Sequence, residues 1–185
     1  MNNYSSSTFY ISHPLTVKHG QLNRTTEQDN KIIQHFLNVK SNEDANPNEC
    51  WKTNWYTHIE HQDVLKGIMD EIHLWYCKNI CPPRGPNFIT ESNSFSADDL
   101  HIDANVWFQE YLSGQFSQQH EHGTLSRFSW VYYLQCGNES SPLTFVKREV
   151  EDRTLEINNL YEQHLPVYNK MIVMFPSCLH HKVYP

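Results

Sequence analysis

The apolar residues of this chain change their spacing at about residue 84, and no other feature constrains the fold as much. Before this point, apolar residues recur at helical spacing over about residues 61–79, and a similar run follows Thr25 and Thr26, either of which can cap a helix. After it come short runs rich in aromatic and β-branched residues, which are typical of strands. They are residues 105–112, 125–135, 143–146 and 171–175. This order predicts an α+β fold in which helices support a sandwich or jelly roll.

Length and composition indicate one globular domain. A chain of 185 residues favours a single core, and aromatic residues make up 13% of it. We expect helical support over about residues 20–84 and a jelly-roll core over about residues 100–185. A jelly roll that ended at Pro185 would leave a sheet edge unpaired, so we expect a further strand after this residue. The same edge is a route to a homodimer.

Charge and cysteine content limit the partners and the compartment. The net charge is −7 and the 14 Lys and Arg residues form no basic run, which argues against duplex nucleic acid as a partner. No segment approaches the roughly 18 apolar residues that span a bilayer, and the N-terminus lacks the features of a signal peptide. The five scattered cysteines are typical of reduced thiols, so we expect a cytoplasmic protein without a membrane partner.

Histidine is unusually frequent, with 12 residues, and two of the stretches that contain it lie beside strand-like runs. At this frequency a His-x-His sequence arises about once by chance, so His120-Glu121-His122 gains its weight from context. Residues two apart on an extended backbone face the same side, so His120 and His122 can bind one ion. A kink would let Glu121 take the place of His122. A third imidazole comes from the end of the chain, from His181 or alternatively from His180.

Two neighbouring ligands and one distant ligand make a three-point site with open positions. This arrangement suits non-heme Fe(II), which needs vacant positions for a co-substrate and O₂, although imidazole also suits Zn²⁺. The residues alone therefore predict a metal site that consists of His120, of His122 or Glu121, and of His181 or His180.

Three tyrosines lie near this site in the sequence. Tyr111 and Tyr133 are candidates to hydrogen-bond an oxoacid or to line its pocket, with core packing as the alternative role for each. Because strand alternation puts Tyr132 and Tyr133 on opposite faces, at most one of these two can do so.

The strand region resembles a known family of oxidoreductases. Its motifs are Trp107-x3-Tyr111-x2-Gly114-x5-His120-x-His122, Ser129-x-Val131-Tyr132-Tyr133-Leu134, Leu143-x-Phe145 and Phe175-Pro176-Ser177-x-Leu179-x-His181-x-Val183. Over roughly residues 105–184 this order is similar to that of small 2-oxoglutarate/Fe(II)-dependent oxygenases of phage and marine bacteria. The resemblance implies a double-stranded β-helix, the cupin-like jelly roll, with iron at its mouth. It implies that His120 is the proximal ligand and that His181, not His180, is the distal one, so we expect His120, His122 and His181 to bind the metal and to be the catalytic residues. It implies that 2-oxoglutarate, a small-molecule co-substrate, is decarboxylated to succinate and CO₂ while a second substrate is hydroxylated. For a phage protein the compartment is the host cytoplasm.

Two departures from the family leave other functions open. The superfamily usually has Asp or Glu where this chain has His122, and three-imidazole iron sites occur in thiol dioxygenases, which do not use 2-oxoglutarate. The cation that usually anchors the co-substrate lies on a final strand beyond Pro185, so the candidates within this chain are Arg127, Lys147 and Lys182. A three-His oxygenase without 2-oxoglutarate and a non-enzymatic jelly-roll binding module are the alternatives. The primary substrate and the oligomeric state stay open.

Overall fold

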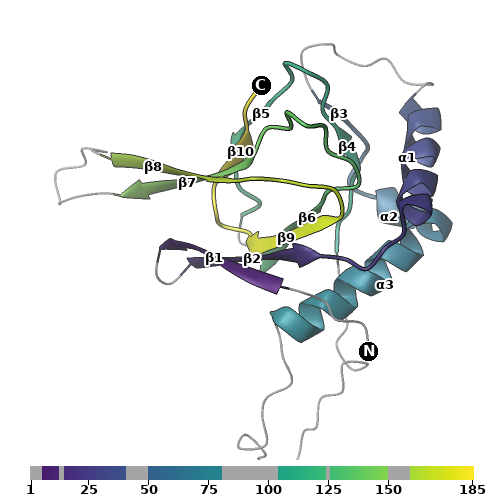
Figure 1. Ribbon diagram of the computed structural model, residues 1–185, viewed down its shortest axis with the longest axis horizontal. Helices are drawn as coiled ribbons and strands as arrows, with labels where there is room; N and C mark the ends of the chain where they lie inside the picture. Colours follow the sequence, from purple (N-terminus) through teal and green to yellow (C-terminus); the bar gives the residue numbers. More distant parts are fainter. Residues whose placement is uncertain (1–5, 13–14, 41–49, 81–103, 124–125, 150–158) are drawn as a thin grey trace, which may run out of the picture.

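The computed structural model describes residues 6–12, 15–40, 50–80, 104–123, 126–149 and 159–185, and side chains are described for these except residues 6–12, 15, 147–149 and 159–160. The described residues contain three helices and ten strands (Figure 1). In chain order these are β1 (Ser6–Ser12), β2 (Leu15–Gln21), α1 (Thr26–Lys40), β3 (Trp51–Lys52), α2 (Thr57–Glu60), α3 (Gln62–Asn79), β4 (Gln109–Glu110), β5 (Ser117–His120), β6 (Phe128–Tyr132), β7 (Leu143–Glu149), β8 (Asn159–Leu165), β9 (Met171–Pro176) and β10 (His181–Val183).

Two four-stranded sheets make up most of the strand region. Their strand orders are β1-β2-β9-β6 and β5-β10-β7-β8, and all neighbouring strands are antiparallel. From β5 to β10 the chain passes repeatedly from one sheet to the other. A third, two-stranded ladder joins β3 to β4. Mixed helices and antiparallel sheets confirm the predicted α+β class.

Strand β9 is buried on both of its faces. Met171, Val173 and Phe175 belong to a core that they share with residues of β7 from the other sheet. Ile172 and Met174, on the opposite face, pack in a second core with the helices. A strand covered on both faces has a continuous apolar sequence, and this is why it could be recognised from sequence alone.

The helices α1 and α3 pack against the outer face of the first sheet (Figure 1). Along α3 the buried residues Leu65, Ile68, Ile72 and Trp75 recur at helical spacing and form one apolar face. This face joins the core that contains Ile172 and Met174. The predicted helical support of the strand region is therefore present.

The start of α1 has the cap that its sequence predicts. The backbone N–H of Gln28 donates to Thr25 Oγ1 at 3.2 Å, and the backbone N–H of Thr25 donates to Gln28 Oε1 at 2.8 Å. These reciprocal bonds form a capping box and satisfy two donors at the open end of the helix.

Residues 105–112, predicted as one strand, are mostly irregular. Only β4 is a strand in this segment, and Val106 adds an isolated bridge to Tyr56. The partner segment explains this, because β3 offers only two residues for pairing before the chain turns into α2. Trp51 of β3 is buried at 7% exposure, whereas Trp55 is 55% exposed.

None of the described helices combines the length and the apolar composition needed to cross a bilayer. The longest, α3, has 18 residues and carries the exposed Lys66–Asp70 ion pair. Among the described residues, Cys50, Cys77, Cys136 and Cys178 form no disulfide. The fifth cysteine, Cys81, lies outside the described residues.

Candidate metal centre

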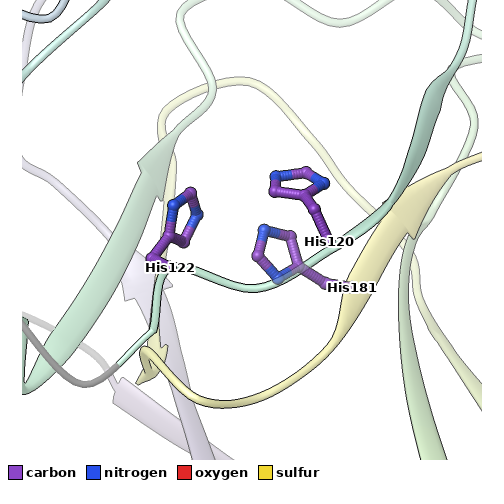
Figure 2. A group of neighbouring side chains, drawn as sticks. All are labelled: His120, His122 and His181. Atoms are coloured by element: carbon purple, nitrogen blue, oxygen red, sulfur yellow. The ribbon is translucent and has the colours of Figure 1, made fainter.

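Three imidazole rings meet beside β5 and β10 (Figure 2). The ring centroids of His120 and His181 lie 4.3 Å apart, those of His122 and His181 lie 5.0 Å apart, and those of His120 and His122 lie 5.2 Å apart. Each ring offers one nitrogen, and the three atoms all lie within 4.8 Å of one another. The structure thus brings together the three histidines that the sequence proposed as ligands; we call them the His cluster.

A β-bulge turns His120 toward His181. The two residues are directly opposite each other in the β5–β10 pair, and Ser117 is opposite Val183. Strand β5 therefore advances three residues where β10 advances two. Without this bulge, alternation would put Ser117 and His120 on opposite faces of the sheet. The extra residue allows both to align with β10 side chains on one face.

His122 reaches the cluster by a different route from the predicted one. The sequence argument placed His120 and His122 on one extended strand, but β5 ends at His120. Beyond the strand, the backbone N–H of His122 donates to the carbonyl of Ser177 at 2.9 Å. Ser177 is itself buried, and its Oγ lies 2.9 Å from Ser129 Oγ on β6. The turn between β9 and β10 therefore positions His122.

Two of the rings are held in one tautomer by backbone carbonyls. His181 Nδ1 lies 2.9 Å from the carbonyl oxygen of Leu179, and His120 Nδ1 lies 2.8 Å from that of Gln118. A carbonyl oxygen only accepts, so each Nδ1 carries the proton and donates it. This leaves each Nε2 with a free lone pair, the arrangement common among metal-bound histidines.

Burial favours the uncharged form of two rings of the cluster, those of His122 and His181. Desolvation lowers the pKa of His181 to about 3, with further lowering from the neighbouring histidines against the opposing effect of the Leu179 carbonyl. Desolvation, followed by the nearby His120, also lowers the pKa of His122. His181 is the most buried of the three rings and His120 the most exposed. Neutral imidazoles are the form that binds metal, so these two rings need not lose a proton at neutral pH.

The alternative ligands considered from the sequence lie outside the cluster. Glu121 Oε2 is 3.9 Å from His180 Nε2, and both side chains are about two-fifths exposed. Among the described residues, the group close enough to hold one ion contains His122 and His181, and it contains neither Glu121 nor His180.

The candidate tyrosines have other partners among the described residues than the His cluster. Tyr111 is hydrogen-bonded to the side chain of Ser117, and burial raises its pKa, so its hydroxyl is protonated. Tyr133 packs with the core between the sheets, and burial raises its pKa as well. Tyr132 faces the other way and donates to Asp29 Oδ2 at 2.8 Å. Strand alternation thus separates Tyr132 and Tyr133 as expected.

The candidate cations differ in their positions. Lys182 Nζ lies 2.5 Å from Glu162 Oε1 and 4.3 Å from the centroid of the Tyr184 ring. Because Lys182 follows His181 in β10, alternation turns it to the opposite face, away from the cluster. Arg127 is exposed, and its carbonyl accepts the N–H of Ser177, the residue that holds His122. The side chain of Lys147 lies outside the described residues.

Two aromatic rings border the cluster, and sequence reasoning did not give them this role. Phe175 lies 4.8 Å from His181, centroid to centroid, and Trp107 lies 5.5 Å from His122. Neither ring nitrogen of His122 has a hydrogen-bond partner among the described residues. From outside the cluster, the ring of Trp107 contacts the ring of His122. Nothing in the sequence around Trp107 distinguishes it from a core tryptophan.

Comparisons with protein-family models, with curated proteins and with solved structures found no match to this chain.

The depressed pKa of His181 predicts how the metal-free protein responds to acid. In the unfolded chain the ring titrates near pH 6.5, and in the folded protein near pH 3. Between these values the unfolded state binds more protons, so the free energy of unfolding falls as pH is lowered, by up to about 1.4 kcal/mol per pH unit from this residue. Urea unfolding at pH 7, 6, 5 and 4 measures this slope. The His181→Gln variant should have a shallower slope, and equal slopes in the two proteins would contradict the assignment.

Proposed function

We propose that this protein is a non-heme Fe(II) dioxygenase that uses 2-oxoglutarate, with His120, His122 and His181 as the iron ligands. The observation that carries the proposal is the convergence of three imidazoles, two from the end of β5 and the residues just beyond it and one from the start of β10. Two of them are oriented by backbone carbonyls so that Nε2 is free. Burying the polar ring of His181 and half-burying that of His122 costs the fold free energy. Metal binding explains why the fold keeps both rings there.

The donor set fits a metal ion. Three imidazole nitrogens bound at about 2.0–2.1 Å in a tetrahedral or octahedral site lie roughly 2.8–3.4 Å from one another. The nitrogens of the His cluster are within 4.8 Å of one another, so small rotations of the rings would close the site. The three histidines would hold the ion from one side, so a co-substrate and O₂ could bind on its other side. When bound there, Fe(II) would supply the chemistry with O₂ that a side chain cannot provide.

The charge of the cluster supports an anionic co-substrate. Three neutral ligands leave the full positive charge of a divalent ion uncompensated, whereas a carboxylate ligand would remove part of it. A dicarboxylate such as 2-oxoglutarate supplies the missing negative charge. Tyr111 and Tyr133 keep protonated hydroxyls that can donate to it, and Arg127 is the candidate cation whose backbone lies beside the cluster.

The sheet topology supports a jelly roll as the scaffold. Between β5 and β10 the chain alternates between two four-stranded antiparallel sheets that share one core. His120 is the last residue of β5, His122 lies two residues beyond it, and His181 is the first residue of β10, so all three lie at or next to a strand terminus. This is the type of position from which a rigid scaffold presents ligands.

A three-His oxygenase without 2-oxoglutarate is the second candidate. It is favoured by the neutral third ligand and by Lys182, which pairs with Glu162 on the face away from the cluster and is not placed to anchor a co-substrate. The two candidates share the metal site and differ in the co-substrate. They therefore separate in one experiment.

The test is an anaerobic titration of the Fe(II)-loaded protein with 2-oxoglutarate. We expect a weak visible charge-transfer band that saturates with one equivalent, and succinate formation once O₂ is admitted. The His180→Gln variant, which changes a histidine outside the cluster, should behave like the unmodified protein. Bound iron with neither band nor succinate would favour the second candidate. No metal uptake would leave the jelly-roll binding module as the function.

A further inference from the structure

We infer that Trp55 and Trp107 form a stacking platform for a flat, uncharged ring of the primary substrate, beside the His cluster. The inference deepens the proposed function and depends on it for the identity of the reaction. It concerns the class of small molecule that the protein oxidises.

A chain of ring contacts links the solvent to the metal ligands. The centroids of Trp55 and Trp107 lie 4.5 Å apart with their planes tilted by 51°. Trp107 in turn lies 5.5 Å from the ring of His122. A ligand that contacts Trp107 therefore lies against the ring that borders His122.

Packing among the described residues does not explain why Trp55 is exposed. Trp51 already anchors this segment in the core at 7% exposure, whereas Trp55 is 55% exposed. A single exposed apolar residue is ordinary. This one, however, contacts a second tryptophan that borders a candidate metal ligand, and Tyr56 and Ile59 in the same segment are 61% and 65% exposed. Exposed aromatic surface next to a site is the feature expected of a binding surface.

Carboxylates neighbour both ends of the contact chain that runs from Trp55 through Trp107 to His122. Glu60 accepts a 2.8 Å hydrogen bond from Asn54, the residue before Trp55. Glu121 precedes His122 and is about two-fifths exposed. Lys40, the cation that contacts β4, is already paired with Glu110. These carboxylates disfavour a phosphate, and a divalent ion held by the His cluster would disfavour a cation. An uncharged ring remains, and stacking on tryptophan is its natural mode of binding.

The test uses the indole Nε1–H signals of the five tryptophans in ¹H–¹⁵N spectra of the full chain, both metal-free and with Zn²⁺. The signals of Trp55 and Trp107 are assigned by their loss in Trp55→Phe and Trp107→Phe. Adenosine and indole are the ring probes, adenosine 5′-monophosphate adds charge to the same ring, and tetramethylammonium is the cationic probe. We expect adenosine and indole to shift these two signals selectively, and the charged probes to bind at least several-fold more weakly.

Trp55→Ala should weaken adenosine binding about 5- to 150-fold, the range found when a stacking side chain is removed. Tyr161→Ala, at another exposed aromatic residue that lies on β8, is the matched control and should leave binding unchanged. The platform is refuted if neither ring probe shifts the two signals, if Trp55→Ala binds adenosine normally, or if a charged probe binds more tightly. Binding of the ring probes is also measured without metal. The platform can therefore be tested even if the His cluster binds no metal.

Discussion

His181→Gln should lower the affinity of the protein for Fe(II) or Zn²⁺ by more than about a hundredfold. Loss of a residue that only orients a ligand typically costs 10- to 100-fold in metal affinity, and loss of a ligand should exceed this. His181 is the most buried member of the His cluster, and its Nδ1 is already used by the Leu179 carbonyl. No other atom of the residue can replace its Nε2. Competition titration with a chromogenic chelator measures the change.

His180→Gln is the control for this experiment, because it changes the neighbouring histidine, whose ring lies near Glu121 and outside the cluster. Its metal affinity should stay within a few-fold of that of the unmodified protein. If the two variants lose affinity equally, the ligand assignment is wrong. If His181→Gln binds metal normally while remaining folded, the ion lies elsewhere.

Asp29→Ala should produce the largest loss of stability among single changes of charged residues. Asp29 is 1% exposed, accepts from Arg24 Nε at 2.7 Å and from the hydroxyl of Tyr132 at 2.8 Å. Arg24 also donates to Glu71 on α3 at 3.0 Å, so the network joins both long helices to β6. Removing one partner of a buried ion pair costs about 3–5 kcal/mol, and here the buried Arg24 would lose the closer of its two carboxylate partners while the Tyr132 hydroxyl would lose its acceptor.

For a chain of this size, that loss corresponds to a fall in Tm of roughly 6–20 °C. Thermal unfolding followed by circular dichroism measures it. Asp70→Ala, which breaks the exposed Lys66–Asp70 pair, is the matched control and should cost less than about 1 kcal/mol. Equal effects of the two changes would show that the Asp29 network adds nothing beyond a surface pair. Metal affinity should survive Asp29→Ala in the folded protein, since the network packs on the other face of β6.

Much of the fold could be predicted from the sequence because the elements that build the core have strong local patterns. The helix predicted over about residues 61–79 is α3, and the apolar run at residues 171–175 is β9. The β7–β8 hairpin was only partly predicted. Its outer part is charged, and its seven paired positions depend on cross-strand hydrogen bonds that local composition does not reveal.

The members of the His cluster could be predicted, but the reason they converge could not. Motif order and strand ends singled out the three histidines. Their geometry depends on a bulge in β5 and on the bond from His122 to Ser177 in the turn after β9. Both are long-range features that no local spacing encodes. For the same reason, the sequence could not indicate that Lys182 faces away from the cluster or that Trp107 borders it.

The proposed catalysis depends on one ion being held by all three imidazoles. A crystal structure of the Fe(II)-loaded protein, with anomalous diffraction recorded at the iron edge, measures this directly. We expect one iron peak about 2.0–2.2 Å from Nε2 of His120, from Nε2 of His181 and from a ring nitrogen of His122. An iron peak elsewhere, or a His cluster without iron in crystals grown with excess Fe(II), would contradict the account.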